Sequence, residues 1–135
     1  MSHFTTIRTK MIDQQHLLAA LRDLGFNTVE TQPTPSTLFG FKADARPERA
    51  EIIIRRKFVG SASNDIGFAK SADGTFQAII SGYDQRKYSH SWLQKVQCRY
   101  AYHATKAALS SEGFSLVDEE QQQDGTLHLV LRRSV

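Results

Sequence analysis

The side chains with the clearest chemical potential lie between residues 92 and 106. His103 follows Arg99 by one turn of an expected helix, and a histidine beside a buried face could carry a proton near neutral pH. The simpler interpretation is a half-buried histidine that hydrogen-bonds a neighbour. Cys98 has Lys95 and Arg99 close by, a setting typical of reactive thiols, but no base or oxyanion site can be assigned around it. These residues support an enzyme hypothesis built on His103 and Arg99, in which no residue is assigned as catalytic.

Metal and phosphate chemistry have less support in this sequence. The five histidines show no His-x-x-x-His spacing and the chain has one cysteine, so no metal-ligand set can be assigned. Residues 60–64 form a loop with glycine and serine that lacks the lysine and the spacing of a phosphate loop. The acidic run at 118–120 alternates between the two faces of a strand, so its carboxylates cannot act as one close pair. We therefore expect neither a metal nor a cofactor.

Aromatic and basic side chains give two binding hypotheses. In the first, exposed rings at Trp92, Tyr88 and Tyr102 anchor a protein interface, where aromatic residues and arginine are favoured. In the second, nearby cations bind the phosphates of a nucleic acid while its bases stack on the rings. The simpler interpretation of the cations is that they solvate a helix. The candidate binding residues are Trp92, Lys95, Arg99, Tyr102, His103 and Lys106.

The element that positions these residues is an amphipathic helix expected at residues 92–109. An apolar stripe along it should face a sheet, with His103 at the margin of the stripe and Tyr102 on the opposite face. Gly113 is a favourable residue just beyond the end of this helix. The stripe contains Leu93, Val96, Tyr100, Ala104, Ala107 and Ala108. A second, cationic strip contains Lys95, Arg99 and Lys106.

A first helix and several strands complete the expected elements. Leucines recur at helical spacing over residues 17–24, after a capping Asp13 and before Gly25. The apolar run at 52–54 is typical of a central strand, and the basic run at 55–57 resembles a small anion patch or, more simply, a solvated strand end. Prolines predict loops at residues 33–35 and 46–48. Strands are expected at residues 4–11, 28–30, 38–42, 50–59, 65–70, 75–80, 116–120 and 126–133, with Asp-Gly turns closing the last two hairpins.

This order of elements predicts an α+β fold with one mainly antiparallel sheet and two helices on one face, of ferredoxin-like character. Both helices end on a Gly-Phe pair, at Gly25 and Gly113, and each follows a strand and precedes two strands. The pattern allows either a strand-helix-strand-strand duplication or the chance recurrence of a common helix ending.

Length and composition limit the class of protein. The chain has 135 residues, of which 40% are hydrophobic and 23% charged, and we expect one globular domain over residues 1–135. The net charge of +3 does not indicate a nucleic-acid binder, although it permits one. A lone cysteine, no secretory signal and no apolar run of membrane-spanning length predict a cytoplasmic or plastid stromal protein without a membrane partner. The oligomeric state is left open.

Several short motifs in a fixed order also carry information. They are Met1–Phe4, Asp23–Phe26, Asp65–Phe68, Arg99–His103, Glu112–Phe114 and the closing stretch from Asp124–Gly125 to Leu131–Arg133. In these the chain resembles the hypothetical chloroplast open reading frame 35 family, also called domain of unknown function 1257, which occurs in cyanobacteria, algal plastids and some other bacteria. One departure is Ser81–Tyr83, where similar proteins often carry a tryptophan-glycine pair. The resemblance implies a cyanobacterial or plastid type of protein and no particular activity.

Three hypotheses for the function follow, in order of preference. The first is a non-catalytic accessory or adaptor protein that binds another protein, because no catalytic set can be assembled from the sequence. The second is a small-molecule or redox-linked enzyme that uses His103 and Arg99 at the margin of the helix. The third is a weak nucleic-acid binder that uses the cationic strip.

Overall fold

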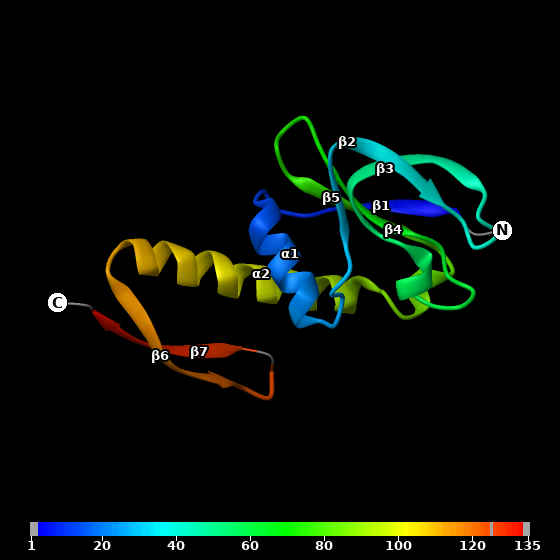
Figure 1. The fold of residues 1–135 in the computed structure, drawn as a ribbon. Helices are drawn as coiled ribbons and strands as arrows, with labels where there is room; N and C mark the ends of the chain where they lie inside the picture. Colours follow the sequence, from blue (N-terminus) through cyan, green and yellow to red (C-terminus); the bar gives the residue numbers. More distant parts are fainter. Residues whose placement is uncertain (1–2, 125, 134–135) are drawn as a thin grey trace. The chain divides into compact units, whose positions relative to one another are not determined.

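The structure is a computed structural model that describes residues 3–124 and 126–133. The chain divides into two compact units, Met1–Tyr100 and Ala101–Val135, and our expectation of a single domain stays a prediction. Figure 1 shows the course of the chain through these elements. In chain order they are β1 (Phe4–Arg8), α1 (Gln14–Asp23), β2 (Glu30–Phe39), β3 (Ala45–Ile54), the 3-10 helix η1 (Arg56–Phe58), β4 (Ile66–Lys70), β5 (Phe76–Ser81), the 3-10 helix η2 (Asp84–Arg86), α2 (His90–Ser111), β6 (Phe114–Gln121) and β7 (Leu127–Arg133).

The first unit is built on a five-stranded sheet in the order β1-β5-β4-β3-β2, in which every neighbouring pair of strands is antiparallel. Strands β2 to β5 follow one another as a meander, and β1 pairs with the outer edge of β5. The turn between β4 and β5 is stabilised by Asp73, whose carboxylate accepts a hydrogen bond from the Thr75 N–H at 3.0 Å. Gly74 in the same turn has a φ of 89°, a conformation that favours glycine.

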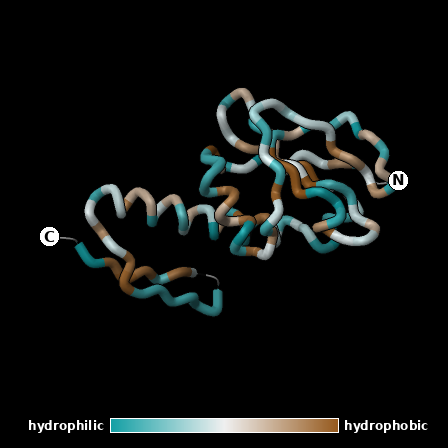
Figure 2. Tube along the Cα trace, in the orientation of Figure 1, coloured by the Kyte–Doolittle hydropathy of each residue, from teal (hydrophilic) through white to brown (hydrophobic). Residues whose placement is uncertain are grey.

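One face of this sheet is covered by α1 and the N-terminal half of α2. Asp13 caps α1 by accepting a hydrogen bond from the His16 N–H at 3.1 Å, as the sequence predicts. Figure 2 shows hydrophobic stretches in the centre of this sheet, and others in the β6–β7 hairpin of the second unit. The buried side chains of this main core include Leu17, Leu21, Ile52, Ile54, Phe68, Leu93 and Val96.

The opposite face is covered by the β2–β3 hairpin, which bends back over the sheet. Leu38 of β2 and Ala50 of β3 are buried there against Ile53 and Ile79. Gly67 of β4 makes this approach possible, because a Cβ atom at that position would lie 2.8 Å from the Ala50 Cβ and 3.0 Å from a Leu38 methyl group. The sheet therefore has a smaller second core on this side.

The second unit contains the end of α2 and the antiparallel β6–β7 hairpin. Gly113 follows the helix with a φ of 88°, as expected for a residue beyond a helix C-terminus. Leu116 is half-buried, whereas its neighbour Val117 and the facing strand's Val130 are exposed. This alternation is typical of a hairpin with one apolar face and one solvated face.

The α+β class, with a mainly antiparallel sheet and two helices, is confirmed. The expected order strand-helix-strand-strand occurs twice, as β1-α1-β2-β3 and as β5-α2-β6-β7. The pairing differs between the two runs: β2 and β3 join the five-stranded sheet, whereas β6 and β7 form a separate two-stranded sheet. The single sheet expected from the sequence is therefore divided in two.

The long helix extends beyond its predicted range at both ends, from His90 to Ser111. In the N-terminal half the predicted apolar stripe is correct, since Leu93 and Val96 are fully buried. In the C-terminal half it is wrong, since Ala107 and Ala108 are exposed. The physical reason is that an alanine methyl group offers little apolar area, so larger side chains decide which face of a helix is buried.

Candidate functional site

The candidate binding residues in the first part of α2 are engaged in packing and pairing. The Arg99 Nε donates a hydrogen bond to the Asp23 carboxylate at 2.9 Å, which links α2 to the end of α1. Trp92 is half-buried, with its ring 5.1 Å from Tyr88 and 6.0 Å from Phe26 between ring centroids. Tyr88 itself is buried, so the expectation that it presents an exposed ring is wrong, and Trp92 is exposed only in part.

The candidate residues in the second part of α2 lie close together in the second unit. Tyr102 is buried, contrary to the exposed position expected from the helical wheel, because its ring offers the large apolar area that the alanine stripe lacks. The ring of half-buried His103 lies 5.0 Å from the Tyr102 ring, and the Lys106 Nζ lies 5.8 Å from the Tyr102 ring centroid. Lys106 also lines a hollow of about 290 Å³ beside the β6–β7 hairpin. Lys95 is exposed on the first part of the helix, and a binding role for all six residues stays a prediction.

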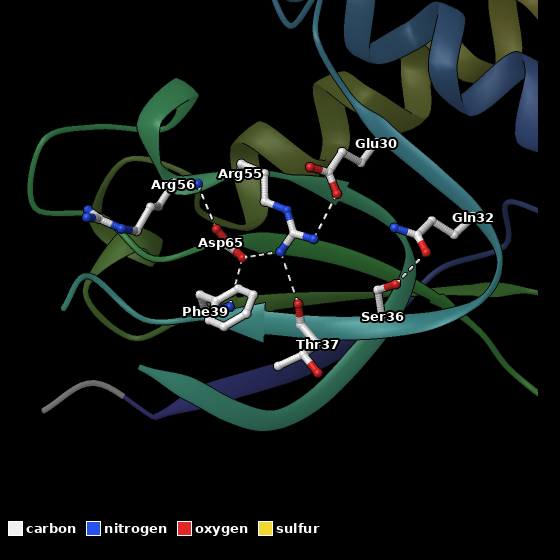
Figure 3. Close-up of polar contacts among 8 residues, drawn as sticks. All are labelled: Glu30, Gln32, Ser36, Thr37, Phe39, Arg55, Arg56 and Asp65. Atoms are coloured by element: carbon white, nitrogen blue, oxygen red, sulfur yellow. Dashed lines mark hydrogen bonds and ion pairs between the residues drawn. The ribbon is translucent and has the colours of Figure 1, made fainter. Parts of the chain in front are cut away.

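An extensive polar network lies instead at the end of β3, around the carboxylate of Asp65 (Figure 3). The Asp65 side chain is 1% exposed and accepts three hydrogen bonds, from the Phe39 N–H at 2.7 Å, the Arg56 N–H at 2.7 Å and the Arg55 guanidinium at 2.8 Å. The Asp65 N–H in turn donates to the Phe39 carbonyl at 3.0 Å. This one residue therefore fastens the end of β2 and the end of β3 to the start of β4.

Arg55 completes the network by joining two carboxylates. Its guanidinium donates to Glu30 at 2.7 Å and to the Thr37 carbonyl at 3.0 Å, in addition to Asp65. The hydrogen bond from Arg55 holds the pKa of the Glu30 carboxyl below its usual range, and the same hydrogen bond raises the pKa of Arg55. The charges of this cluster are therefore compensated within the fold, and Arg55 is a structural rather than a ligand-binding cation.

A second buried network fixes the loop before β4. The Asp84 carboxylate accepts from the Asn64 N–H at 2.9 Å and from the Ser81 hydroxyl at 2.8 Å. The Asn64 side chain donates to the Ser81 hydroxyl at 2.9 Å and accepts from the Phe41 N–H at 3.0 Å. Nearby, the Tyr88 hydroxyl donates to the Val59 carbonyl. Residues 59–65 are thus held from both sides by hydrogen bonds to side chains rather than left as a loose connection.

Two surface hollows lie on either side of this fixed loop and share Gly60 and Ser61. The first, of about 560 Å³, adjoins β2 and η1, and the second, of about 400 Å³, adjoins η2. His103 lines neither of them. We define the aromatic–basic rim as seven side chains that line these two hollows together with Phe58, which follows Lys57 in η1 and lines a separate hollow. The seven are Phe39, Arg56, Lys57, Ser61, Tyr83, Arg86 and Lys87.

The rim combines exposed rings with cations. Phe39, Phe58 and Tyr83 are 37%, 42% and 39% exposed. The Arg86 guanidinium stacks 4.0 Å from the centroid of the Tyr83 ring, and the Lys57 Nζ lies 5.0 Å from the centroid of the Phe58 ring. The Arg86 Nε also donates to the Tyr83 carbonyl at 3.2 Å, so this guanidinium is held in place. Exposed rings and oriented cations are the side chains that most often contribute binding energy at interfaces.

The electrostatic character of the rim follows from which charges are buried. Asp65 and Asp84 line the hollows but are buried and hydrogen-bonded, whereas Lys57, Arg86 and Lys87 are exposed. The surface offered to solvent is therefore cationic. Its chemistry is that of anion binding, because both lining carboxylates are already committed as acceptors within the fold.

The sequence predicts only part of the network and the rim. The basic run at residues 55–57 is visible in it, but the partners of Arg55 are distant in sequence, at Glu30 and Asp65. One feature of the sequence could have predicted the network: the charged Arg55 comes directly after the buried run 52–54, and a charge at the end of a central strand needs a partner. Nothing comparable in the sequence indicates that Tyr83 belongs to the rim.

The described residues also bear on metal binding and on membrane crossing. Within residues 3–124 and 126–133, no three His, Cys, Asp or Glu side chains are grouped so that they could hold a metal ion. Across the same residues, no helix has both the length and the apolarity needed to cross a membrane.

Comparison with known proteins places the chain in a family. The family model described as "Protein of unknown function (DUF1257)" matches residues 20–130. The "Uncharacterized protein ycf35" of Cyanophora paradoxa is 26% identical over 134 residues, which cover 98% of each chain. The protein of the same name in Pyropia yezoensis is 26% identical over 136 residues, again covering 98% of each chain. No solved structure matches this chain. The chain therefore belongs to the DUF1257 family of proteins of unknown function, as its sequence motifs predict.

Proposed function

We propose that this protein is a non-catalytic accessory or adaptor protein that binds another protein through the aromatic–basic rim. The observation that carries the proposal is the rim itself: three exposed rings with oriented cations, set around a loop that two buried hydrogen-bond networks hold in place. A surface that is already ordered loses little conformational entropy on binding, so more of the contact energy becomes affinity.

The proposed binding surface does not include α2, which carries the candidate side chains predicted from the sequence. Trp92 and Tyr102 contribute to packing, and Arg99 pairs with Asp23. Lys95 and Lys106 are exposed on α2 and lie outside the rim. We also propose the cytoplasm or the plastid stroma as the compartment, since a single exposed cysteine suits a reducing environment.

Site-specific photo-crosslinking in an extract of the source organism tests the proposal. Phe58 is replaced by p-benzoylphenylalanine in the full chain, and the same replacement at Val130, which is 52% exposed on β7, serves as the control. We expect a discrete crosslinked product from position 58 that is absent from position 130 and is digested by protease but not by nuclease. Absence of a product at position 58, or an identical product at both positions, would show that the rim is not a protein-binding surface.

A charge variant provides an independent measurement on the same surface. In chains that carry the crosslinker at position 58, Lys57→Glu should reduce the yield of the product, because it reverses a cation beside the ring. Lys10→Glu makes the same charge change at an exposed position beyond the end of β1 and should leave the yield unchanged. Equal effects of the two substitutions would contradict a contact at the rim.

A further inference from the structure

We infer that the partner segment recognised by the aromatic–basic rim is an acidic, extended stretch of polypeptide. This inference rests on the proposed function and adds the chemistry of the partner to it. It follows from three properties of the rim: the sign of its exposed charge, the way cations cover its rings, and the continuity of its two hollows.

The exposed charge of the rim is positive on both sides of the Gly60–Ser61 loop. Lys57 and the half-buried Arg56 line the first hollow, and Arg86 and Lys87 line the second. The carboxylates in the same hollows lie beneath the surface and accept hydrogen bonds from the protein itself. A ligand with carboxylates at two separated positions would therefore meet a pair of cations in each hollow.

The rings of the rim are arranged for carboxylates rather than for stacked bases. A nucleic-acid base stacks on the face of a ring, and a cation lies over one face of each ring of the rim: Lys57 over Phe58, Arg86 over Tyr83, and Arg55 over Phe39. The edge of each ring carries partial positive charge, and Lys57 and Arg86 add a full positive charge beside two of the three rings. Both features attract a carboxylate, and the apolar part of each ring can contact an apolar side chain beside it.

The two hollows favour an extended ligand. They share Gly60 and Ser61 as lining residues, so a single segment that crosses the exposed Ser61 would contact both pairs of cations. Successive side chains of an extended chain point to opposite sides, so acidic residues at alternate positions would face the protein together. Ser61 offers a hydroxyl donor at the midpoint of this path.

Fluorescence anisotropy with defined probes tests the inference. The probe is a fluorescein-labelled synthetic peptide in which Glu alternates with Leu, and the reference peptide has Gln in place of every Glu. We expect the full-length protein to bind the Glu peptide at least about tenfold more tightly than the Gln peptide, since several charge pairs are lost together. Equal binding of the two peptides overturns the inference.

Paired charge-reversal variants locate the binding. The double variant Lys57→Glu with Lys87→Glu should weaken binding of the Glu peptide by about tenfold. The double variant Arg8→Glu with Lys10→Glu changes the net charge equally and should alter binding by less than about twofold, because both exposed positions lie at the end of β1, outside the rim. Equal loss in both variants would mean that net charge alone attracts the peptide. Unchanged circular dichroism and melting curves establish that every variant is folded.

A single-stranded DNA oligonucleotide of equal length serves as the competing probe. We expect it to bind more weakly than the Glu peptide at 150 mM salt, a concentration near physiological ionic strength. Tighter binding of the oligonucleotide, with a steep loss of affinity as salt rises, overturns the inference in favour of nucleic acid. If the Glu peptide does not bind while the crosslinked protein at position 58 persists, this inference fails and the proposed function stands. If both are absent, both fail.

Discussion

At the scale of single residues, the most informative feature is the carboxylate of Asp65. A buried ionised group is tolerated when hydrogen bonds and an opposite charge replace the water it has lost. Asp65 has three such donors, which come from the end of β2, the end of β3 and the Arg55 guanidinium. Its position sets the geometry of the first hollow, because Phe39 and Arg56 both belong to the rim and both donate to it.

Replacement of this carboxylate should therefore reduce stability strongly. We expect Asp65→Asn to lower the free energy of unfolding by about 3 kcal/mol, because Arg55 loses a buried counter-charge and an amide NH₂ group faces a backbone donor. Urea denaturation followed by circular dichroism measures the change. Asp118→Asn, an exposed position on β6, is the matched control and should shift the value by less than about 0.5 kcal/mol. Similar values for the two variants would contradict a structural role for Asp65.

The Glu30–Arg55 pair should make stability depend on pH. The pKa of Glu30 is lowered from 4.5 by its hydrogen bond with Arg55, so the folded protein binds this proton less readily than the unfolded chain. The contribution is therefore fully present above pH 4.5 and is lost as the pH falls through the lower folded pKa. The pair is partly exposed to solvent, so the contribution should be below about 1 kcal/mol.

Comparison of wild type with Glu30→Gln measures this contribution. The difference in free energy of unfolding between the two proteins should be constant from pH 6 to pH 8 and should shrink as the pH is lowered below 4.5. Urea denaturation at each pH gives the values. A difference that grows on acidification would have the wrong sign for a carboxylate with a lowered pKa.

At the scale of elements, local signals identified the helices and the tight hairpins. The Asp13 cap and Gly25 delimit α1, and the Asp-Gly turn at residues 73–74 defines β4 and β5, because each of these features depends on neighbours in sequence. In the β2–β3 hairpin, by contrast, the local sequence signals predict loops where the structure has strands. The residues around Pro33 and Pro35 lie inside β2, and the predicted loop at 46–48 lies inside β3.

Proline is accepted in β2 because β2 is an edge strand of the sheet, and its pairing with β3 is irregular between Thr31 and Ser36. The pairing is irregular again between Thr37 and Phe39, where the facing stretch of β3 contains Pro47. An edge strand has one side without ladder partners, so a residue without an N–H can be placed there. The sequence predicts separate short strands at residues 28–30 and 38–42, the second of them at an edge, but it does not show that one edge strand runs through both prolines, and this explains why they predict a loop.

The candidate site, too, can be predicted from the sequence only where its residues are neighbours in the chain. The basic run 55–57 is visible as a pattern, but the rim also requires Phe39 and Tyr83, which strand pairing and loop packing bring to the two hollows. The burial of Tyr102 was missed for a related reason. A helical wheel ranks faces by average hydrophobicity, whereas the folded protein buries the side chain with the larger apolar area.

The bend of the β2–β3 hairpin over the sheet depends on Gly67. We expect Gly67→Ala to lower the free energy of unfolding by about 2 kcal/mol, because the new methyl group would press on Ala50 and Leu38 in a filled core. Gly82→Ala is the matched control: its nearest atom, the His3 carbonyl oxygen, would lie at 3.8 Å, an ordinary contact. Thermal melts of both variants give the comparison. If the two glycines tolerate alanine equally, close approach at Gly67 is not required.

At the scale of the whole molecule, the two units differ in how much core they contain. Every buried side chain of the two apolar clusters lies between Met11 and Val96, and the partly buried residues packed on them extend from Phe4 to Tyr100. All of these residues belong to the first unit. The rim lies there as well, so the proposed binding function and the main source of stability share one part of the chain.

This distribution predicts how fragments of the chain behave. A fragment of residues 1–111 retains both clusters and should melt cooperatively, since apolar burial is the main source of folding free energy. A fragment of residues 101–135 contains part of α2 and a two-stranded sheet, and should show no cooperative transition, because a single hairpin is at most marginally stable in water. Circular dichroism melts and the dispersion of amide resonances distinguish these outcomes. An unfolded fragment 1–111 would mean that β6 and β7 supply contacts on which the first unit depends, whereas a folded one that still binds the Glu peptide would show that recognition does not require β6 and β7.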